Sequence, residues 1–181
     1  MKIWIISLIF LVILGGCSAD KELEKQITLD SGEIINLNTS GFKVTGTSYL
    51  IDIPETWEII DDEFCDFFAK EISDDLPVLM VTGSEKEYAK DIETFLSVFT
   101  EGFKEMDQVA VSENNIISED IKTLNYSGKA ATIEIEDGIA KCIALETKKE
   151  YVMLMFMGEK TYFAENEKVI NQILDSFNAT R

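Results

Sequence analysis

The sequence predicts an α+β fold, an α/β/α sandwich in which a central antiparallel sheet is flanked by helices. Two turn signals, at residues 137–138 and 148–149, divide residues 133–157 into three antiparallel strands. Apolar side chains occupy both faces of the central strand, so both faces need a cover. Two amphipathic stripes, one following Ser84 and one ending at Phe177, predict helices that could supply it.

Residues 1–18 combine a basic start, an apolar run and small residues before a cysteine. Lys2 precedes an apolar run that ends at Leu14, and two glycines separate that run from Cys17. A membrane-spanning helix needs about 20 apolar residues, so the run fits a secretory signal better. Leu14-Gly15-Gly16-Cys17 resembles the lipobox of bacterial lipoproteins, which implies that Cys17 is lipidated and becomes the first mature residue. The alternative is an ordinary cleaved signal in which Cys17 falls by chance.

The expected domain organisation has three parts. Residues 1–16 are a signal peptide, residues 17–40 are the lipidated N-terminus with a polar tether, and residues 41–181 form a single α+β domain. The chain has 34 acidic and 16 basic residues, a formal net charge of −18, and no histidine. Such a charge repels nucleic-acid phosphates and anionic lipid headgroups. We therefore expect no nucleic-acid partner, and attachment to the membrane through the lipid alone.

Short apolar stretches predict the strands of the N-terminal half. Ile34, Ile35 and Leu37 suggest a short edge strand within the tether. The clearest strand covers residues 49–54, where apolar and polar residues alternate until a proline ends the pattern. Two more strands are expected at Phe64–Lys70 and Pro77–Thr82, separated by the polar turn Ser73-Asp74-Asp75.

Two helices are expected on the faces of this sheet. Ser84-Glu85-Lys86-Glu87 has the pattern of a capping box, which predicts a helix N-terminus at Ser84. The second helix runs from about Tyr162 to Phe177. Steps of three and four residues define the apolar stripe of the first helix: Tyr88, Ile92, Phe95, Leu96, Phe99, Phe103 and Met106. The stripe of the second is Phe163, Ile170, Ile173, Leu174 and Phe177.

The two hairpin turns predict a register. A type I′ turn at Asp137-Gly138 would pair Ile133 with Cys142 and place Glu134 opposite Lys141. A turn at Lys148-Lys149 would pair Cys142 with Met155. One face of the unit then contains Ile133, Ile135, Ala140, Cys142, Met153, Met155 and Met157. The other contains Ile143, Leu145, Val152, Leu154 and Phe156.

The order of these elements resembles the PsbP-like superfamily over roughly residues 45–178. The resemblance is carried by Tyr49-x-Ile51-x-Ile53-Pro54-x-x-Trp57, the mid-chain helix, the antiparallel strands, and a last helix ending Ile173-Leu174-Asp175-Ser176-Phe177. It implies an α/β/α sandwich and a role in binding or assembly, because the better-known members are accessory proteins. It transfers no functional residues. Tyr49, Trp57 and Phe177 resemble family positions that serve packing.

Catalytic patterns are missing from the sequence. Without histidine there is no Ser-His-Asp or Cys-His pair, and no Gly-x-Ser-x-Gly elbow occurs. Carboxylate pairs such as Asp61-Asp62-Glu63 and Asp74-Asp75 are common in so acidic a chain. A glycosidase would need one carboxyl group in an apolar pocket. We therefore expect a protein that is not an enzyme and has no cofactor.

Sulfur-containing residues suggest a possible metal site. Met153, Met155 and Met157 share a strand face with Cys142, and soft sulfur ligands suit Cu(I). Methionine also fills irregular core gaps, so we expect a structural role for all four residues. Calcium at Asp61-Asp62-Glu63 fits less well, because the Asp-x-Asp-x-Asp-Gly spacing is absent. Cys65 and Cys142 are both expected to be buried, either as a disulfide or as two free thiols.

Together these patterns predict a lipid-anchored, extracytoplasmic, non-catalytic binding or adaptor module of the bacterial cell envelope. Its expected partners are the membrane, through the lipid on Cys17, and a protein of the envelope. A small-ligand or Cu(I)-binding lipoprotein is the alternative, and a hydrolase is the third possibility. A groove with exposed aromatics and no converging carboxylates would favour the binding or adaptor module. A solvent-accessible cluster of the three methionines and Cys142 would favour the ligand-binding or Cu(I)-binding lipoprotein.

Overall fold

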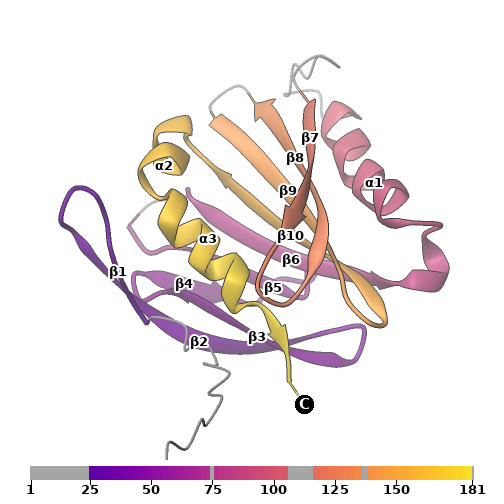
Figure 1. Ribbon diagram of the computed structural model, residues 1–181, viewed down its shortest axis with the longest axis horizontal. Coiled ribbons are helices and arrows are strands. Elements are labelled where there is room, and N and C mark those ends of the chain that lie inside the picture. The colour runs from indigo at the N-terminus through magenta and orange to yellow at the C-terminus, as the bar shows by residue number, and fades with distance from the viewer. Residues whose placement is uncertain (1–24, 74–75, 106–115, 136–137, 181) are drawn as a thin grey trace, which may run out of the picture.

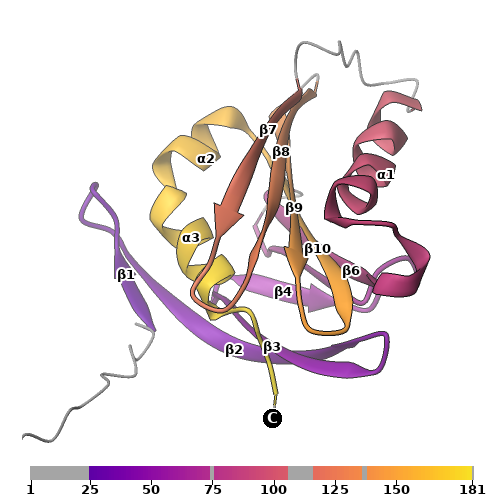
Figure 2. The same ribbon diagram turned by 45° about the vertical axis from the view of Figure 1, so that its right-hand side comes forward.

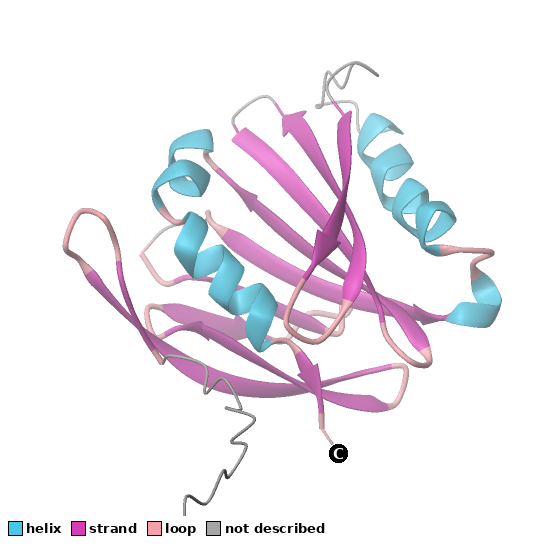
Figure 3. Cartoon of the chain, viewed as in Figure 1, coloured by secondary structure: helices cyan, strands magenta, loops and turns pink. Residues whose placement is uncertain are grey.

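A computed structural model of the chain describes residues 25–73, 76–105, 116–135 and 138–180. Over these residues the backbone forms two antiparallel sheets with helices packed against them (Figure 1). Strands account for most of the regular structure (Figure 3). No helix in the described part of the chain is long and apolar enough to span a bilayer.

The smaller sheet has the strand order β1-β2-β3-β11. Its strands are β1 (Gln26–Thr28), β2 (Ile34–Val44), β3 (Thr47–Pro54) and β11 (Asn178–Ala179). The turn between β2 and β3 has positive φ at Thr45 (45°) and Gly46 (93°). Two positive φ angles are what a type I′ hairpin requires, so this turn fixes the β2–β3 register.

The larger sheet has the order β4-β5-β6-β10-β9-β8-β7. Its first strands are β4 (Trp57–Ile60), β5 (Phe67–Glu71), β6 (Val78–Glu85) and β7 (Ile116–Lys122). The others are β8 (Ser127–Ile135), β9 (Gly138–Glu146) and β10 (Glu150–Gly158). The central strand β10 is buried along almost its whole length, as its apolar run from Tyr151 to Met157 requires.

Helices contact both faces of the larger sheet. α1 (Ile92–Glu105) packs against β8, β9 and β10, and α3 (Glu167–Ser176) lies on the opposite side, where it also contacts β3 (Figure 2). α2 (Lys160–Glu165) precedes α3, and a single 3₁₀ turn (Lys86–Tyr88) precedes α1. Two apolar cores result, one on each face of the larger sheet.

The expected α/β/α sandwich is wrong, because the chain is β-rich and has a second sheet. Strands β1 and β2 lie inside residues 17–40 and just beyond, where we expected a polar tether with at most a short edge strand. Only Leu37 and Val44 of β2 are buried, while most of its polar residues are exposed. On the α3 face, the smaller sheet therefore provides much of the cover that a helical layer was expected to give.

The predicted start of the first helix is also wrong. Ser84 and Glu85 continue strand β6, where they pair with Tyr151 and Glu150. The helix begins later, and its N-terminal cap is Asp91, whose Oδ1 accepts a hydrogen bond of 2.8 Å from the Thr94 amide. The apolar stripe is confirmed in part. Phe95, Leu96 and Phe103 are buried, Ile92 and Phe99 are half-buried, Tyr88 is exposed, and Met106 lies outside the described residues.

One predicted hairpin register is confirmed and the other is wrong by two residues. Cys142 pairs with Met155, as expected. Ile133 pairs with Ala140, not Cys142, and Glu134 lies opposite Ile139, not Lys141. The link between β8 and β9 is residues 136–137, which lie outside the described part. Because the shift is even, the residues assigned to each face are confirmed.

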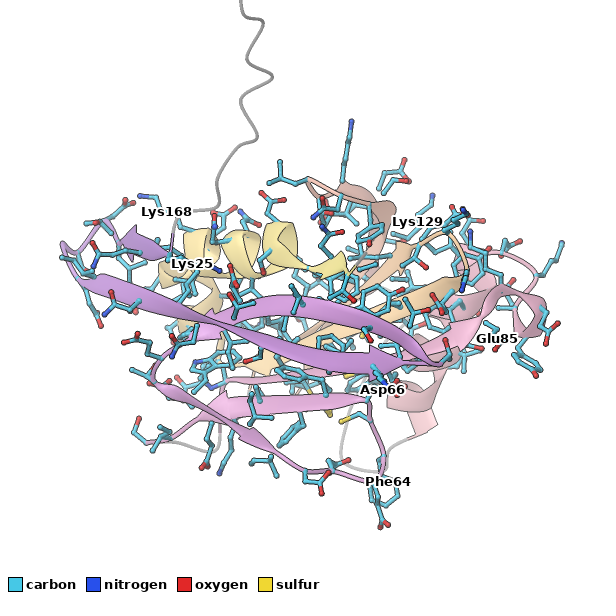
Figure 4. All side chains as sticks on the ribbon, turned by 90° about the horizontal axis from the view of Figure 1, so that it is seen from below. Lys25, Phe64, Asp66, Glu85, Lys129 and Lys168 are labelled. Carbon is cyan, nitrogen blue, oxygen red and sulfur yellow. The ribbon has the colours of Figure 1, made fainter. Side chains whose placement is uncertain are left out.

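The C-terminal helix is divided at Asn166 into α2 and α3, and its predicted stripe is buried apart from the half-buried Phe163. The strand expected to start at Phe64 begins at Phe67. Phe64 is 86% exposed, and its backbone amide donates a hydrogen bond of 2.7 Å to the Asp62 carboxylate. Its side chain points away from the body of the molecule (Figure 4).

Candidate functional site

Cys17, the predicted lipidation site, lies outside the described residues. The first described residue, Lys25, is fixed to the domain, because its ammonium donates to Asp52 Oδ2 (2.5 Å) and Thr39 Oγ1 (2.7 Å). The Asp52 carboxylate is almost fully buried. Nearby, Lys168 of α3 pairs with Asp30. Both lysines lie at the same end of the molecule (Figure 4), so the chain enters the domain at a defined position.

The predicted sulfur cluster lies in the core under α1. Met153 and Cys142 are fully buried, Met155 is 9% exposed and Met157 is half-buried. Phe95 and Leu96 of α1 belong to the same apolar cluster. Burial raises the pKa of the Cys142 thiol to about 12, so the sulfur stays protonated at neutral pH. The four sulfur-containing residues lie on one face of the sheet, as the predicted register requires, and α1 covers that face.

The acidic turn at residues 61–63 is exposed, and Asp62 uses its carboxylate to cap Phe64. Among the described residues, no three His, Cys, Asp or Glu side chains are grouped closely enough to hold a metal ion. Cys65 is half-exposed, so the expectation that it is buried is wrong. It and Cys142 are free thiols. Partial burial, and then the neighbouring Asp62 charge, raise the pKa of Cys65 to about 11.

A buried carboxylate, which the sequence did not indicate, joins the two sheets. Glu150, the first residue of β10, is 2% exposed. Its Oε1 accepts from the hydroxyls of Thr45 (2.9 Å) and Thr47 (2.5 Å), and its Oε2 from Tyr49 (2.8 Å). The hydroxyl oxygen of Thr147 lies 3.2 Å from Oε2 of Glu150. Burial alone would raise the pKa of Glu150, but these hydrogen bonds together lower it below its ordinary value.

Glu150 lies in the wall of an open groove of about 730 Å³. The rim is mixed in charge, because Lys86 and Lys149 stand beside Glu85 and Glu87. Lys86 is already paired with Glu146 (2.7 Å). A carboxylate has about four lone-pair positions, and the hydroxyl contacts of Glu150 occupy them. We therefore assign this cluster a structural role.

A second groove, of about 250 Å³, lies where β2, β4 and β5 meet α2 and α3. Trp57 is the first residue of β4, Tyr162 is in α2, and Glu71 ends β5. We name it the aromatic groove. Its lining residues are Glu33, Ile35, Pro54, Thr56, Trp57, Glu71, Tyr162, Asn166 and Val169.

Two aromatic side chains in this groove have polar atoms without a partner among the described residues. Neither the Trp57 indole N–H nor the Tyr162 hydroxyl makes a hydrogen bond to another described residue. No fully buried side-chain nitrogen or oxygen in the described residues lacks a partner, so both groups must reach the surface. Trp57 is 7% exposed, and it is one of the residues that line this groove. The predicted packing role of Trp57 is confirmed, because its ring lies in the core.

The electrostatic field of the aromatic groove is negative. Glu71 is half-buried and Glu33 is exposed, and no lysine or arginine is among the lining residues. Desolvation, and then the Glu71 charge, raise the pKa of Tyr162, so its hydroxyl remains protonated. An adjoining concavity of about 350 Å³ shares Glu71 and Tyr162 and adds Glu159 and Glu165. Nothing in the local sequence indicates that these glutamates and Tyr162 lie together, because they come from both halves of the chain.

Comparisons with known proteins show similarity in structure only. No family model matches the chain, and no curated protein matches it in sequence. The solution structure of cyanobacterial PsbP (CyanoP) from Synechocystis sp. PCC 6803 matches with a TM-score of 0.57 and 11% identity, over 92% of this chain and 99% of that one. A crystal structure from Bacteroides thetaiotaomicron VPI-5482 has a TM-score of 0.41 and 12% identity, over 74% and 45% of the two chains. The first match confirms that the chain has a PsbP-like fold.

Proposed function

We propose that the chain is a lipid-anchored, non-catalytic binding module on the extracytoplasmic face of a bacterial cell membrane. The observation that carries the binding role is the aromatic groove, which is lined by Trp57 and Tyr162, and the polar atoms of both have no partner among the described residues. A hydrogen-bond donor in a partly closed groove is poorly solvated, so a ligand that supplies the acceptor gains binding free energy there. The lipobox-like residues 14–17 support the anchor.

The groove meets the criterion for a binding module only in part, because aromatic residues line it but the carboxylates of Glu33 and Glu71 also converge there. Binding still fits the groove better than hydrolysis does. A glycosidase-type general acid is a carboxyl group whose apolar surroundings keep it protonated. Glu33 is exposed and Glu71 is only half-buried, so solvent reaches both carboxylates. The chain also contains no histidine to activate a nucleophile. These carboxylates are therefore assigned to recognition.

The burial of the sulfur cluster weighs against the copper alternative. A Cu(I) site needs access for the ion and a thiolate or thioether free to coordinate it. Met153 and Cys142 have no exposed surface under α1.

The anchor is tested by expressing the full chain and its Cys17→Ala variant in a bacterial host with an alkyne-labelled fatty acid. We expect the unmodified sequence to incorporate the label and to enter the membrane fraction. The Cys17→Ala variant should lose the label and either be released or keep its signal. Cys65→Ala is the matched control and should behave like the unmodified chain. Equal labelling of the Cys17→Ala variant would contradict the proposal.

The binding role is tested with a photo-crosslinking amino acid in the anchored full chain. Thr56 is an exposed residue of the aromatic groove, whereas Val98 is an exposed residue of α1, on the other face of the larger sheet. We expect irradiated cells to give a discrete adduct from position 56 and none from position 98. No adduct from position 56, or the same adducts from both positions, would show that the groove is not a binding surface.

A further inference from the structure

We propose that the aromatic groove receives a lysyl side chain of a partner protein, whose ammonium pairs with Glu71 and Glu33. This inference rests on the binding role proposed above and names the ligand class of the same site. It follows from the charge of the groove, from its aromatic and apolar lining, and from the unpartnered indole N–H.

Charge selects a cation. Among the described residues, four carboxylates line the groove and its adjoining concavity, and neither lining contains a lysine or arginine. These are Glu33, Glu71, Glu159 and Glu165. The formal charge of the whole chain, −18, adds to this local field. An anionic ligand such as a phosphate or a carboxylate would be repelled, whereas a cation would be attracted over several ångströms.

The lining of the groove suits a cation carried on an apolar stem. The half-buried Tyr162 provides aromatic surface, and a cation within about 6 Å of such a ring is attracted by its π electrons. Ile35, Pro54 and Val169 provide apolar surface for methylene groups. A groove of about 250 Å³ is smaller than most pockets for whole small molecules, which span roughly 300–1,000 Å³. One side chain is therefore a suitable occupant.

The Trp57 N–H indicates that the lysine belongs to a peptide chain. An indole N–H can only donate, so its partner must be an acceptor, and the ammonium group has none to offer. A backbone carbonyl next to the lysyl residue would supply the acceptor. The ligand would thus satisfy both features, because the carbonyl meets Trp57 while the ammonium meets the glutamates.

Trp57 makes the inference directly measurable. The chain has two tryptophans, Trp4 and Trp57, and Trp4 lies in the expected signal peptide, so the processed, lipidated protein reports on Trp57 alone. The probe is a short peptide with one central lysine flanked by glycines, blocked at both ends and titrated in detergent at low salt. We expect a saturable change in Trp57 fluorescence. Acetylation of the lysyl nitrogen should weaken binding at least tenfold, and raised ionic strength should weaken it further.

Variants separate recognition from general surface charge. Glu71→Gln should weaken binding of the lysyl peptide about tenfold, which corresponds to about 1.4 kcal/mol. Glu87→Gln removes the same charge outside the groove and should have little effect. Tyr162→Leu should weaken binding, whereas Tyr162→Phe, which keeps the ring, should largely preserve it. If Glu71→Gln fails to fold, the exposed Glu33→Gln provides the same comparison.

Several results would overturn the inference. One is equal binding of the lysyl peptide and its acetylated form, and another is equal loss in the Glu71→Gln and Glu87→Gln variants. A fluorescence change with phosphatidylethanolamine vesicles and none with the peptide would assign the groove to a lipid headgroup instead. Crosslinked adducts from position 56 without any response to the lysyl peptide would remove this inference and leave the proposed binding role standing.

Discussion

The phenolic hydroxyl of Tyr49 donates a hydrogen bond of 2.8 Å to Oε2 of Glu150, a residue 101 positions later in the chain. Tyr49 is in β3 of the smaller sheet and Glu150 is in β10 of the larger one. The ring of Tyr49 also stacks on Phe177 at 4.8 Å between centroids. One residue thus joins a polar contact between the sheets to the apolar core beneath α3.

The first prediction is that Glu150→Gln destabilises the protein by about 2–3 kcal/mol at neutral pH, because hydrogen bonds to a charged group are replaced by weaker ones. Hydrogen bonds hold the folded-state pKa of Glu150 below its ordinary value of 4.5 despite burial. Its contribution to stability is therefore complete above about pH 4.5 and is lost as the pH falls through the folded-state pKa.

Urea unfolding at neutral pH and at about pH 3 checks this prediction, because the gap between the two proteins should narrow in acid. The control is Glu85→Gln, the exposed residue that pairs with Glu150 across β6 and β10, and it should change stability little. A gap that stays constant from neutral pH into acid would show that the carboxylate charge of Glu150 does not stabilise the fold.

The second prediction concerns the contact between α1 and the larger sheet. Phe95 is 5% exposed, and its ring centroid lies 5.7 Å from the ring centroid of Tyr151. Phe95→Ala should lower the free energy of unfolding by about 3–5 kcal/mol, because it leaves a cavity in the core. Val98 is 65% exposed on the same helix, and Val98→Ala should stay within about 0.5 kcal/mol. Equal unfolding midpoints for the two variants would mean that the packing of Phe95 against the larger sheet does not stabilise the fold.

Local patterns predicted the hairpin of β9 and β10 and the buried face of α3 correctly. The pairing of Cys142 with Met155 follows from a two-residue turn at Lys148-Lys149, and the stripe of α3 follows from helical spacing. The error at residues 137–138 moved the register by two residues and kept every side chain on its face. Because side chains alternate between the two faces of a strand, a register error of two residues does not change the face on which a side chain lies.

The sequence could not predict the second sheet or the two grooves. Most side chains of β2 face water, so Asn38, Thr39 and Ser40 look like a tether even though their backbone pairs with β3. The Glu150 cluster and the aromatic groove join residues that are distant in the chain. No spacing rule relates such positions, because the fold alone brings them together.

The third prediction compares two glycines. A Cβ added at Gly128 in β8 would lie 1.9 Å from the Ala144 carbonyl oxygen of the neighbouring strand. Gly128→Ala should therefore separate β8 from β9 and cost more than about 3 kcal/mol, a severe effect for one methyl group. Gly102 is in α1 and has open space around it, so Gly102→Ala should stabilise by about 0.5–1 kcal/mol. Thermal unfolding of both variants checks the pair, and opposite shifts in Tm are the expected result.

The last prediction is that the sulfur cluster is structural. Copper and a hydrophobic core would both require Met153, Met155, Met157 and Cys142 on one face, so only access distinguishes them. Met153 and Cys142 have no exposed surface, and burial raises the pKa of Cys142 to about 12. A thiol that stays protonated is a poor ligand, because the metal binds the thiolate.

The measurement is anaerobic competition for Cu(I) between a coloured chelator and the full chain. Cys17→Ala and Cys65→Ala remove the other two thiols, so that the cluster alone is measured. We expect no stoichiometric transfer of copper to the protein. Met155→Leu, which nearly conserves volume, should cost less than about 1.5 kcal/mol and leave the competition unchanged. A one-to-one complex that Met155→Leu weakens while the fold persists would mean that α1 opens to admit the ion, and it would assign copper binding to this face.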